Sequence, residues 1–195
     1  MTGKTHVAIG VVTGLTISVG QSLENQLIIV LTSVIGSLAP DLDHPKAKLN
    51  QKLLFLKNQF FRTLFYLVIA LGFIYLYLIT QNNIFGLLGI MTFFIGISNH
   101  RGFTHSIVGF LVFSSIVRLV AERYNLPSIS TGFIIGYISH LLADFFTIKG
   151  IKLFYPVKTN ISSPILIRTN GVIEKLIFSF LSLYSVFLLY KYMII

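Results

Sequence analysis

The chain alternates between long apolar stretches and short polar ones, a pattern typical of proteins built from several hydrophobic helices. The apolar stretches cover residues 5–23, 25–40, 64–79, 84–98, 107–117, 129–148 and 176–190. A helix that crosses a bilayer needs about 20 residues, with roughly 17 as a lower limit. Several stretches are shorter, and we expect them to be tilted, re-entrant or buried among longer neighbours. The pattern predicts an all-α, polytopic membrane bundle of six or seven transmembrane or membrane-embedded helices, with seven preferred, in one domain over 1–195.

Composition supports a membrane bundle. Hydrophobic residues make up 54% of the chain and charged residues only 11%, whereas a soluble domain carries about 25% charged residues. The absence of cysteine excludes disulfides, thiolate nucleophiles and cysteine-type zinc sites. A net charge of +9 on a soluble protein would point to nucleic acid. In so apolar a chain, Lys and Arg instead orient the helices, and we expect membrane lipids rather than nucleic acid as partners.

The basic residues are distributed unevenly between the two predicted faces of the membrane. With seven alternating crossings, segments 1–6, 40–62, 99–105 and 149–175 lie on the side of the N-terminus. They hold 12 of the 15 Lys and Arg residues. The positive-inside rule therefore predicts a multi-pass cell-membrane protein with this face in the cytoplasm.

The same face gathers the histidines and aspartates. Ionisable groups near membrane segments are costly and usually mark function. The predicted topology places eight such residues at helix ends or in loops of this face: His6, Asp41, Asp43, His44, His100, His105, His140 and Asp144. Since the crossing count does not use the histidines, their convergence is independent support for a shared site.

His140 and Asp144 are four residues apart and therefore share one helical face. An imidazole and a carboxylate so placed can bind one cation, or the carboxylate can orient the imidazole from behind. The alternative is an internal hydrogen-bonded pair between packed helices.

Asp41, Asp43 and His44 lie between Pro40 and Pro45, which predicts a rigid, non-helical turn. In an extended segment the two aspartates face the same side. Neighbouring carboxylates repel each other unless a cation neutralises them or one keeps a proton. The alternative is a solvated loop at a helix end.

His100 and His105 are five residues apart, and a bend at Gly102 would bring their rings together. Arg101 between them can offer a planar fork of donors to a phosphate or a carboxylate. Thr104 is placed to cap a helix that begins near His105. The alternative is an ordinary interfacial turn.

Two further residues are ambiguous when taken alone. His6 enters an apolar helix, where a lone histidine is more often structural. Glu174 begins the last helix, where it is either a ligand or base, or a carboxylate that favours the helix dipole.

Imidazole and carboxylate ligands without thiolate suit zinc above all, with manganese and iron as alternatives. We expect one or two divalent ions, because the candidate ligands exceed what one tetrahedral centre needs. The predicted metal ligands are His6, Asp41, Asp43, His100, His105, His140 and Asp144. His44 is predicted to be a ligand or proton carrier, Arg101 to stabilise phosphate charge, and Glu174 to act as a further catalytic group.

These motifs resemble the YdjM-like family of bacterial inner-membrane proteins, described as membrane-bound metal-dependent hydrolases. The resemblance runs from residue 5 to 174 and rests on Thr5-His6 with Gly10, Pro40-Asp41-Leu42-Asp43-His44, His100-Arg101-Gly102-Phe103-Thr104-His105-Ser106, Gly136 with Ser139-His140 and Asp144, and Thr169, Gly171 and Glu174. The family is distantly similar to zinc-dependent phospholipase C enzymes, which implies phosphoester hydrolysis without naming a substrate.

The leading hypothesis is a membrane-bound metal-dependent hydrolase that cleaves a phosphoester with a metal-activated water. Its substrate would be a phospholipid or another anionic amphiphile that reaches the site from the membrane. The alternatives are a metal or proton transporter that uses the intramembrane His and Asp residues, and a non-catalytic membrane protein with a structural metal. The oligomeric state is left open by the sequence.

Overall fold

A computed structural model describes residues 1–44, 58–98 and 101–194. These residues form seven α-helices and two short 3₁₀ helices, so the predicted all-α bundle of seven helices is confirmed. The elements are α1 (Gly3–Ile17), α2 (Leu23–Leu38), η1 (Ala39–Asp43), α4 (Gln59–Thr80), α5 (Asn83–Ile97), η2 (Phe103–His105), α6 (Ile107–Arg123), α7 (Pro127–Phe145) and α8 (Val172–Ile194).

Among the residues that the structure describes, three segments are long and apolar enough to cross a membrane, namely Leu23–Asp43, Gln59–Thr80 and Val172–Tyr192, and the apolar helix Asn83–Ile97 is shorter. Large apolar side chains cover much of the outer surface of these helices. Monomeric soluble proteins rarely expose apolar patches of this extent. Lipid tails are a suitable solvent for such a surface, so the composition and the surface agree.

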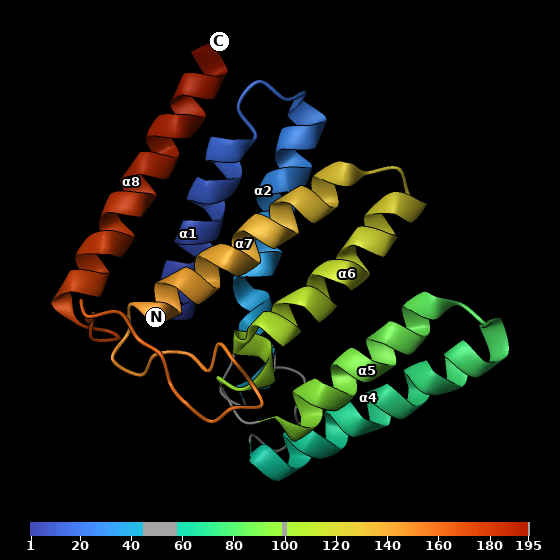
Figure 1. Cartoon of the computed structure of the whole chain (residues 1–195). Coiled ribbons are helices and arrows are strands. Elements are labelled where there is room, and N and C mark those ends of the chain that lie inside the picture. Colours follow the sequence, from blue (N-terminus) through green and yellow to red (C-terminus); the bar gives the residue numbers. More distant parts are fainter. Residues whose placement is uncertain (45–57, 99–100, 195) are drawn as a thin grey trace.

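The helices are arranged as three hairpins and one added helix (Figure 1). α1 pairs with α2, α4 with α5, and α6 with α7, while α8 packs on α1. α2 lies against both α1 and α7, whereas the α4–α5 hairpin reaches the rest of the bundle mainly through α5, with a further bond from Arg62 of α4 to η1. The N-terminus lies beside the C-terminal end of α7, and the chain's C-terminus is at the opposite end. Loops that are far apart in the sequence therefore gather at one end of the bundle.

Small residues allow α2 and α7 to approach backbone to backbone. A Cβ on Gly136 would stand 2.0 Å from the Ser33 carbonyl oxygen, and one on Gly36 would stand 2.2 Å from the Phe133 carbonyl oxygen. In membranes, where lipid is as apolar as leucine, such close packing is a main source of helix association. The crossing also brings the Ser37 carbonyl of α2 within 2.7 Å of His140 Nδ1 on α7. The packing of small residues thus positions a predicted site residue.

Gly136→Ala is expected to destabilise the protein, because the added methyl group would overlap the α2 backbone and force the two helices apart. Overpacking typically costs roughly 1–3 kcal/mol. Gly72→Ala in α4 is the matched control, since a Cβ there meets nothing within 4 Å. Thermal unfolding in detergent should show a lower midpoint for Gly136→Ala only. Equal midpoints for both variants would contradict the close crossing.

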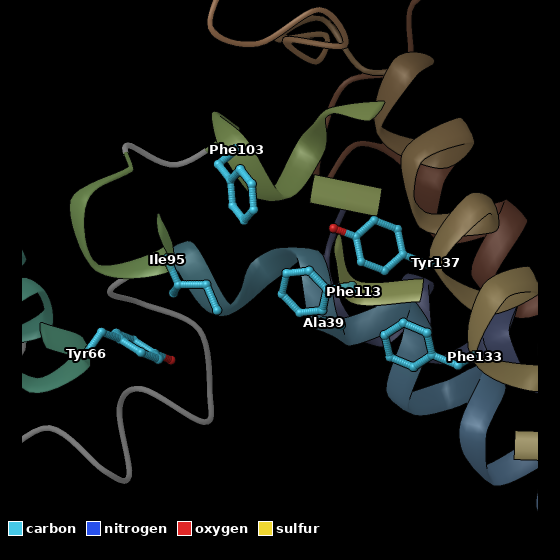
Figure 2. Close-up of a cluster of buried hydrophobic side chains, with 7 residues drawn as sticks. All are labelled: Ala39, Tyr66, Ile95, Phe103, Phe113, Phe133 and Tyr137. Carbon is cyan, nitrogen blue, oxygen red and sulfur yellow. The ribbon is translucent and has the colours of Figure 1, made fainter. Parts of the chain in front are cut away.

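A cluster of buried side chains joins η1, α4, α5, η2, α6 and α7: Ala39, Tyr66, Ile95, Phe103, Phe113, Phe133 and Tyr137 (Figure 2). Phe103 stacks on Phe94 with ring centroids 4.9 Å apart. The Tyr137 hydroxyl donates a 2.5 Å hydrogen bond to the Thr104 carbonyl oxygen. The cluster therefore fixes η2, and with it His105, against α5 and α7.

Candidate metal centre

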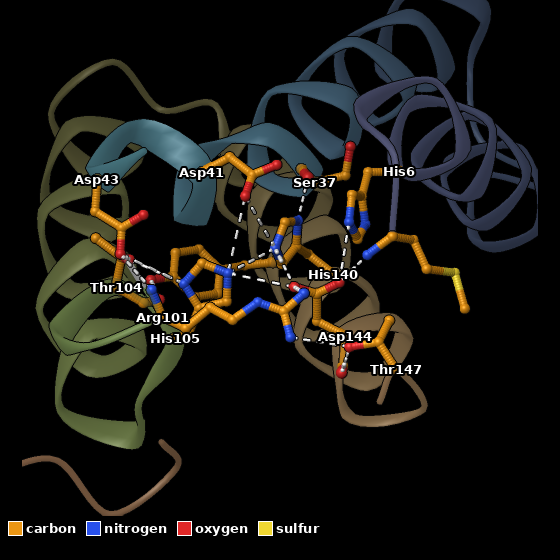
Figure 3. A network of polar contacts seen from close by, with 12 residues as sticks. His6, Ser37, Asp41, Asp43, Arg101, Thr104, His105, His140, Asp144 and Thr147 are labelled. Atoms are coloured by element: carbon orange, nitrogen blue, oxygen red, sulfur yellow. Dashed lines mark hydrogen bonds and ion pairs between the residues drawn. The ribbon is translucent and has the colours of Figure 1, made fainter. Parts of the chain in front are cut away.

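Four segments bring their polar side chains together at the loop end of the bundle (Figure 3). α1 contributes one histidine, η1 two aspartates, the turn through η2 an arginine and a histidine, and α7 a histidine and an aspartate. The converging residues are His6, Asp41, Asp43, Arg101, His105, His140 and Asp144. The predicted His100 lies outside the described residues, as do Lys46, Lys48, Lys52 and Lys57 of the predicted segment 40–62.

The segment that carries Asp41 and Asp43 is a 3₁₀ helix, so the prediction of a non-helical turn was wrong. Pro40 does not prevent the helix, because it lies at the first positions, where the missing N–H has no intrahelical acceptor. The helical turn directs the two carboxylates to different partners. Asp41 faces the rings of His105 and His140, whereas Asp43 accepts hydrogen bonds from the η2 turn.

The cap of α6 also differs from the prediction. The Ser106 side chain accepts a hydrogen bond from the Gly109 N–H at 3.1 Å and caps the helix. Thr104 instead donates to Asp43 Oδ2 at 2.6 Å. The threonine hydroxyl is engaged by a buried carboxylate, which is a stronger acceptor than a neutral oxygen.

His6, His140 and Asp144 are buried and form one group able to hold a metal ion, because their ligand atoms all lie within 4.8 Å of one another. His6 Nε2 lies 3.4 Å from Asp144 Oδ1, and the rings of His6 and His140 stack with centroids 3.8 Å apart. Within the described part of the chain, neither ring nitrogen of His6 makes a hydrogen bond. A buried polar atom without a partner costs about 1–3 kcal/mol, and a bound cation would remove that cost.

Asp41, His105 and His140 form a second group able to hold a metal ion, in which Asp41 is partly exposed. Nε2 of His105 is 3.2 Å from Nε2 of His140, and Asp41 Oδ1 lies 3.9 Å from the first and 4.0 Å from the second. His140 belongs to both groups. Its Nδ1 is held by the Ser37 carbonyl, so only Nε2 is available as a ligand. The two groups therefore surround a single nitrogen, at which one ion can bind.

Asp43 lies behind His105 rather than in either group. Its Oδ2 is 3.7 Å from His105 Nδ1 and accepts hydrogen bonds from Thr104 Oγ1 at 2.6 Å and the Arg101 N–H at 3.0 Å. A carboxylate on the far nitrogen of an imidazole orients the ring and leaves the near nitrogen for a metal. Asp43 therefore lies where a carboxylate can orient His105, whereas the sequence predicted it to be a direct ligand.

Negative charge dominates the surroundings of His105. Burial by itself would lower the pKa of this histidine, but contacts with Asp144 and Asp43 outweigh burial and raise it to about 9. At neutral pH the site therefore retains a proton on His105. A divalent cation would meet the same excess of negative charge.

Arg101 ties the centre to the loop after α7. Its Nη2 is 2.8 Å from Asp144 Oδ2, and its Nη1 donates to Thr147 Oγ1 at 2.9 Å and to the Gly150 carbonyl at 2.6 Å. The Arg101 backbone adopts a left-handed conformation (φ 63°), which is uncommon for a residue other than glycine. Asp144 also pairs with the amino group of Met1.

Glu174 and His44 do not join either ligand group. Glu174 accepts hydrogen bonds from the Thr2 N–H at 2.5 Å, the Thr5 hydroxyl at 2.8 Å and the Asn170 N–H at 2.5 Å. It thereby fastens the start of α1, and so His6, to the turn before α8. His44 follows η1 and lines a cavity beside Asp41.

Arg62 is a buried residue whose role the sequence interpretation missed, because it was counted with the basic loop. Its guanidinium donates to the Asp43 carbonyl and to the carbonyls of Gly96 at 3.1 Å and Ser98 at 2.7 Å. These bonds tie η1 to the end of α5. The sequence does place Arg62 in the first turn of an apolar helix, on the face it shares with Tyr66, and this position could have indicated its burial.

A cavity of about 1250 Å³ opens beside the centre. Asp41 and Arg101 belong both to its lining and to the metal centre. The lining also includes polar residues such as His44 and Glu174. Apolar side chains from α1, α2 and α8 and three lysines form another part of the wall: Val7, Ile35, Leu38, Phe178, Lys4, Lys149 and Lys175. A ligand in this cavity would thus contact lysines, apolar side chains and the edge of the centre.

The chain matches the YdjM inner membrane protein family over residues 1–195. It is 26% identical over 190 residues to the uncharacterized protein YvsG of Bacillus subtilis strain 168, a match that covers 97% of this chain and 95% of that protein. It is 29% identical over 163 residues to the inner membrane protein YdjM of Escherichia coli K12, covering 82% of this chain and 66% of that protein. No solved structure matches the chain. The family match and the apolar helices support residence in a membrane, and the chain belongs to the YdjM family of inner membrane proteins.

Proposed function

We propose that the protein is a membrane-bound, metal-dependent hydrolase that cleaves a phosphoester of a lipid or amphiphile. The observation that carries the proposal is the convergence of His6, Asp41, His105 and Asp144 around Nε2 of His140. Imidazoles and carboxylates suit zinc first, and also manganese or iron. The centre would hold one or two such ions, one of them at His140.

Each side chain has a defined task in this proposal. A bound divalent ion supplies Lewis acidity and lowers the pKa of water. Arg101 lines the cavity, and its positive charge would stabilise a phosphate there while its terminal nitrogens bond Asp144, Thr147 and Gly150. His44 stands in the cavity wall beside Asp41, where it can carry a proton to or from the leaving group. Asp43 and the Ser37 carbonyl hold His105 and His140 in orientation.

We further propose a multi-pass topology with the centre on the cytoplasmic face. Lys4, Lys149 and Lys175 lie with the centre at one end of the bundle, as the positive-inside rule requires. The chain has no cysteine of its own, so a thiol reagent will label only a cysteine introduced by mutation. In intact cells, an impermeant thiol reagent should label Gln81→Cys at the opposite end and spare Lys158→Cys. Labelling of Lys158→Cys instead would reverse the orientation.

The proposal is tested by metal analysis of the purified protein together with a panel of phosphoesters. At least one divalent ion per chain and release of product from one phosphoester are expected. Asp41→Asn should lower both, whereas Lys158→Gln should change neither. A protein without metal, or with metal but no turnover of any phosphoester, would contradict the proposal. Metal transport into liposomes without hydrolysis would favour a transporter.

Metal affinity is expected to rise with pH. His105 has a pKa of about 9, so below that pH an ion must displace a proton from it. The apparent affinity should therefore increase about tenfold per unit between roughly pH 6 and pH 8. Calorimetry in buffers of different ionisation enthalpy would count the released proton. Asp43→Asn should move this dependence to lower pH, and an affinity independent of pH would contradict the role of His105 as a ligand.

A further inference from the structure

The cavity beside the centre lies between α1, α2 and α8. Val7 comes from α1, Ile35 and Leu38 from α2, and Phe178 from α8. Its volume of about 1250 Å³ exceeds the roughly 300–1,000 Å³ of most small-molecule pockets. The space suits a ligand with a polar headgroup and an attached chain.

The cavity is continuous with the lipid-facing surface of α2. Leu27, Leu31, Ile35 and Leu38 follow one another at spacings of three or four residues, so they form one stripe along the helix. All four are exposed, and the last two also line the cavity, with 58% and 38% of their surface accessible. An acyl chain can therefore pass from the bilayer into the cavity without leaving apolar surface.

The charge at the other side of the cavity is positive. Lys4, Lys149 and Lys175 are exposed, and the structure gives no ion pair for them within the residues it describes. The lining holds two carboxylates against these three lysines. Glu174 is buried and accepts hydrogen bonds from Thr2, Thr5 and Asn170, and Asp41 faces the histidines, so the excess charge on this side is positive. This arrangement is complementary to an anionic headgroup joined to an apolar chain.

We propose that an anionic membrane lipid enters this cavity sideways from the leaflet, between α2 and α8. Its headgroup lies on Lys4, Lys149 and Lys175, next to Arg101 and Asp41, and its chain follows the stripe on α2. The proposal names the substrate class of the centre and rests on the proposed function for the chemistry. Binding itself requires no metal and is tested without it.

The chain contains no tryptophan, so a single introduced tryptophan can report on lipid contact. Phe178→Trp places the reporter in the cavity, and Ile35→Trp provides a second reporter at an exposed position that tolerates the larger ring. Phe180→Trp, on the outer surface of α8, is the control. Each variant is reconstituted with chelator into vesicles of phosphatidylcholine that contain a fraction of brominated phosphatidylglycerol or brominated phosphatidylcholine, and quenching is measured.

Brominated phosphatidylglycerol is expected to quench the cavity reporters with at least about fivefold higher apparent affinity than brominated phosphatidylcholine. A fivefold difference is about what the attraction of a single lysine to an anionic lipid surface contributes. The outer reporter should respond to both lipids equally. Changing the three cavity lysines to glutamine should abolish the preference, and changing Lys158, Arg168 and Lys191 to glutamine should retain it.

Equal quenching of the cavity reporters by the two lipids, or a preference that survives loss of the cavity lysines, would overturn the inference. Because no metal is present, a protein without hydrolytic activity would still give this result. If the protein hydrolyses soluble phosphoesters but shows no preference between the two lipids, the proposed hydrolytic activity stands and the binding of an anionic lipid is rejected. The two proposals therefore fail separately.

Discussion

His140→Ala is expected to lower the metal content more than any other single substitution at the centre. His140 is the residue common to both ligand groups, and its Nε2 lies 3.2 Å from Nε2 of His105 and 4.0 Å from both Asp41 Oδ1 and Asp144 Oδ2. Loss of a residue that only hydrogen-bonds to a metal ligand typically lowers metal affinity 10–100-fold. Loss of the ligand His140 itself should therefore lower the affinity by more than about 100-fold. Elemental analysis of protein purified with and without added zinc would measure it.

His44→Ala is the matched control, since His44 belongs to neither group. It should keep the wild-type metal content and lower turnover only. Ser37 contributes through its backbone carbonyl, so Ser37→Ala should also retain the metal. A His140→Ala protein that keeps its full complement of metal would show that the ions bind elsewhere.

Asp144→Asn is expected to impair both metal binding and folding. Asp144 contacts His6 and His105 and pairs with Arg101 at 2.8 Å and with the amino group of Met1. Asparagine removes the negative charge and leaves the nearly buried Arg101 guanidinium uncompensated. Breaking a buried ion pair in this way typically costs about 3–5 kcal/mol, and the metal should be lost as well. Thermal unfolding of the metal-free protein measures the loss of stability separately from the loss of metal.

Glu122→Gln is the control for the ion pair. Arg118 and Glu122 lie 2.9 Å apart, almost the same distance as Arg101 and Asp144, but both side chains are exposed. Exposed pairs contribute only about 0–1 kcal/mol, because water already stabilises both charges. An equal loss of stability in the two variants would show that burial does not decide the strength of the Asp144 pair.

The helices were predictable because each is a local pattern. Apolar residues in long runs, interrupted at polar turns such as Gln81 and Asn82, predicted all seven α-helices of the described chain. The physical reason is that backbone groups in lipid must be satisfied within the helix itself. The family was also predictable, because its motifs are short and ordered along the chain.

The different contacts that the individual polar residues make could not be predicted from the sequence. Whether Asp41 and Asp43 act alike depends on the conformation of η1, and the 3₁₀ helix places them beside opposite ring nitrogens of His105, with Asp41 also near His140. Glu174 fastens Thr2 and Thr5 because α8 packs on α1, which no local signal reveals. Arg62 is buried through contacts with carbonyls that are 19 to 36 residues away in sequence.

By itself, the sequence determined that the chain forms apolar helices, that it belongs in a membrane, and that its histidines and aspartates fall at one predicted face. These properties depend on composition and spacing. Only the tertiary structure decided which side chains meet at His140 and that three distant lysines share one cavity with an apolar wall. Such meetings depend on how closely helices cross, and here glycine and serine at the α2–α7 contact set that distance.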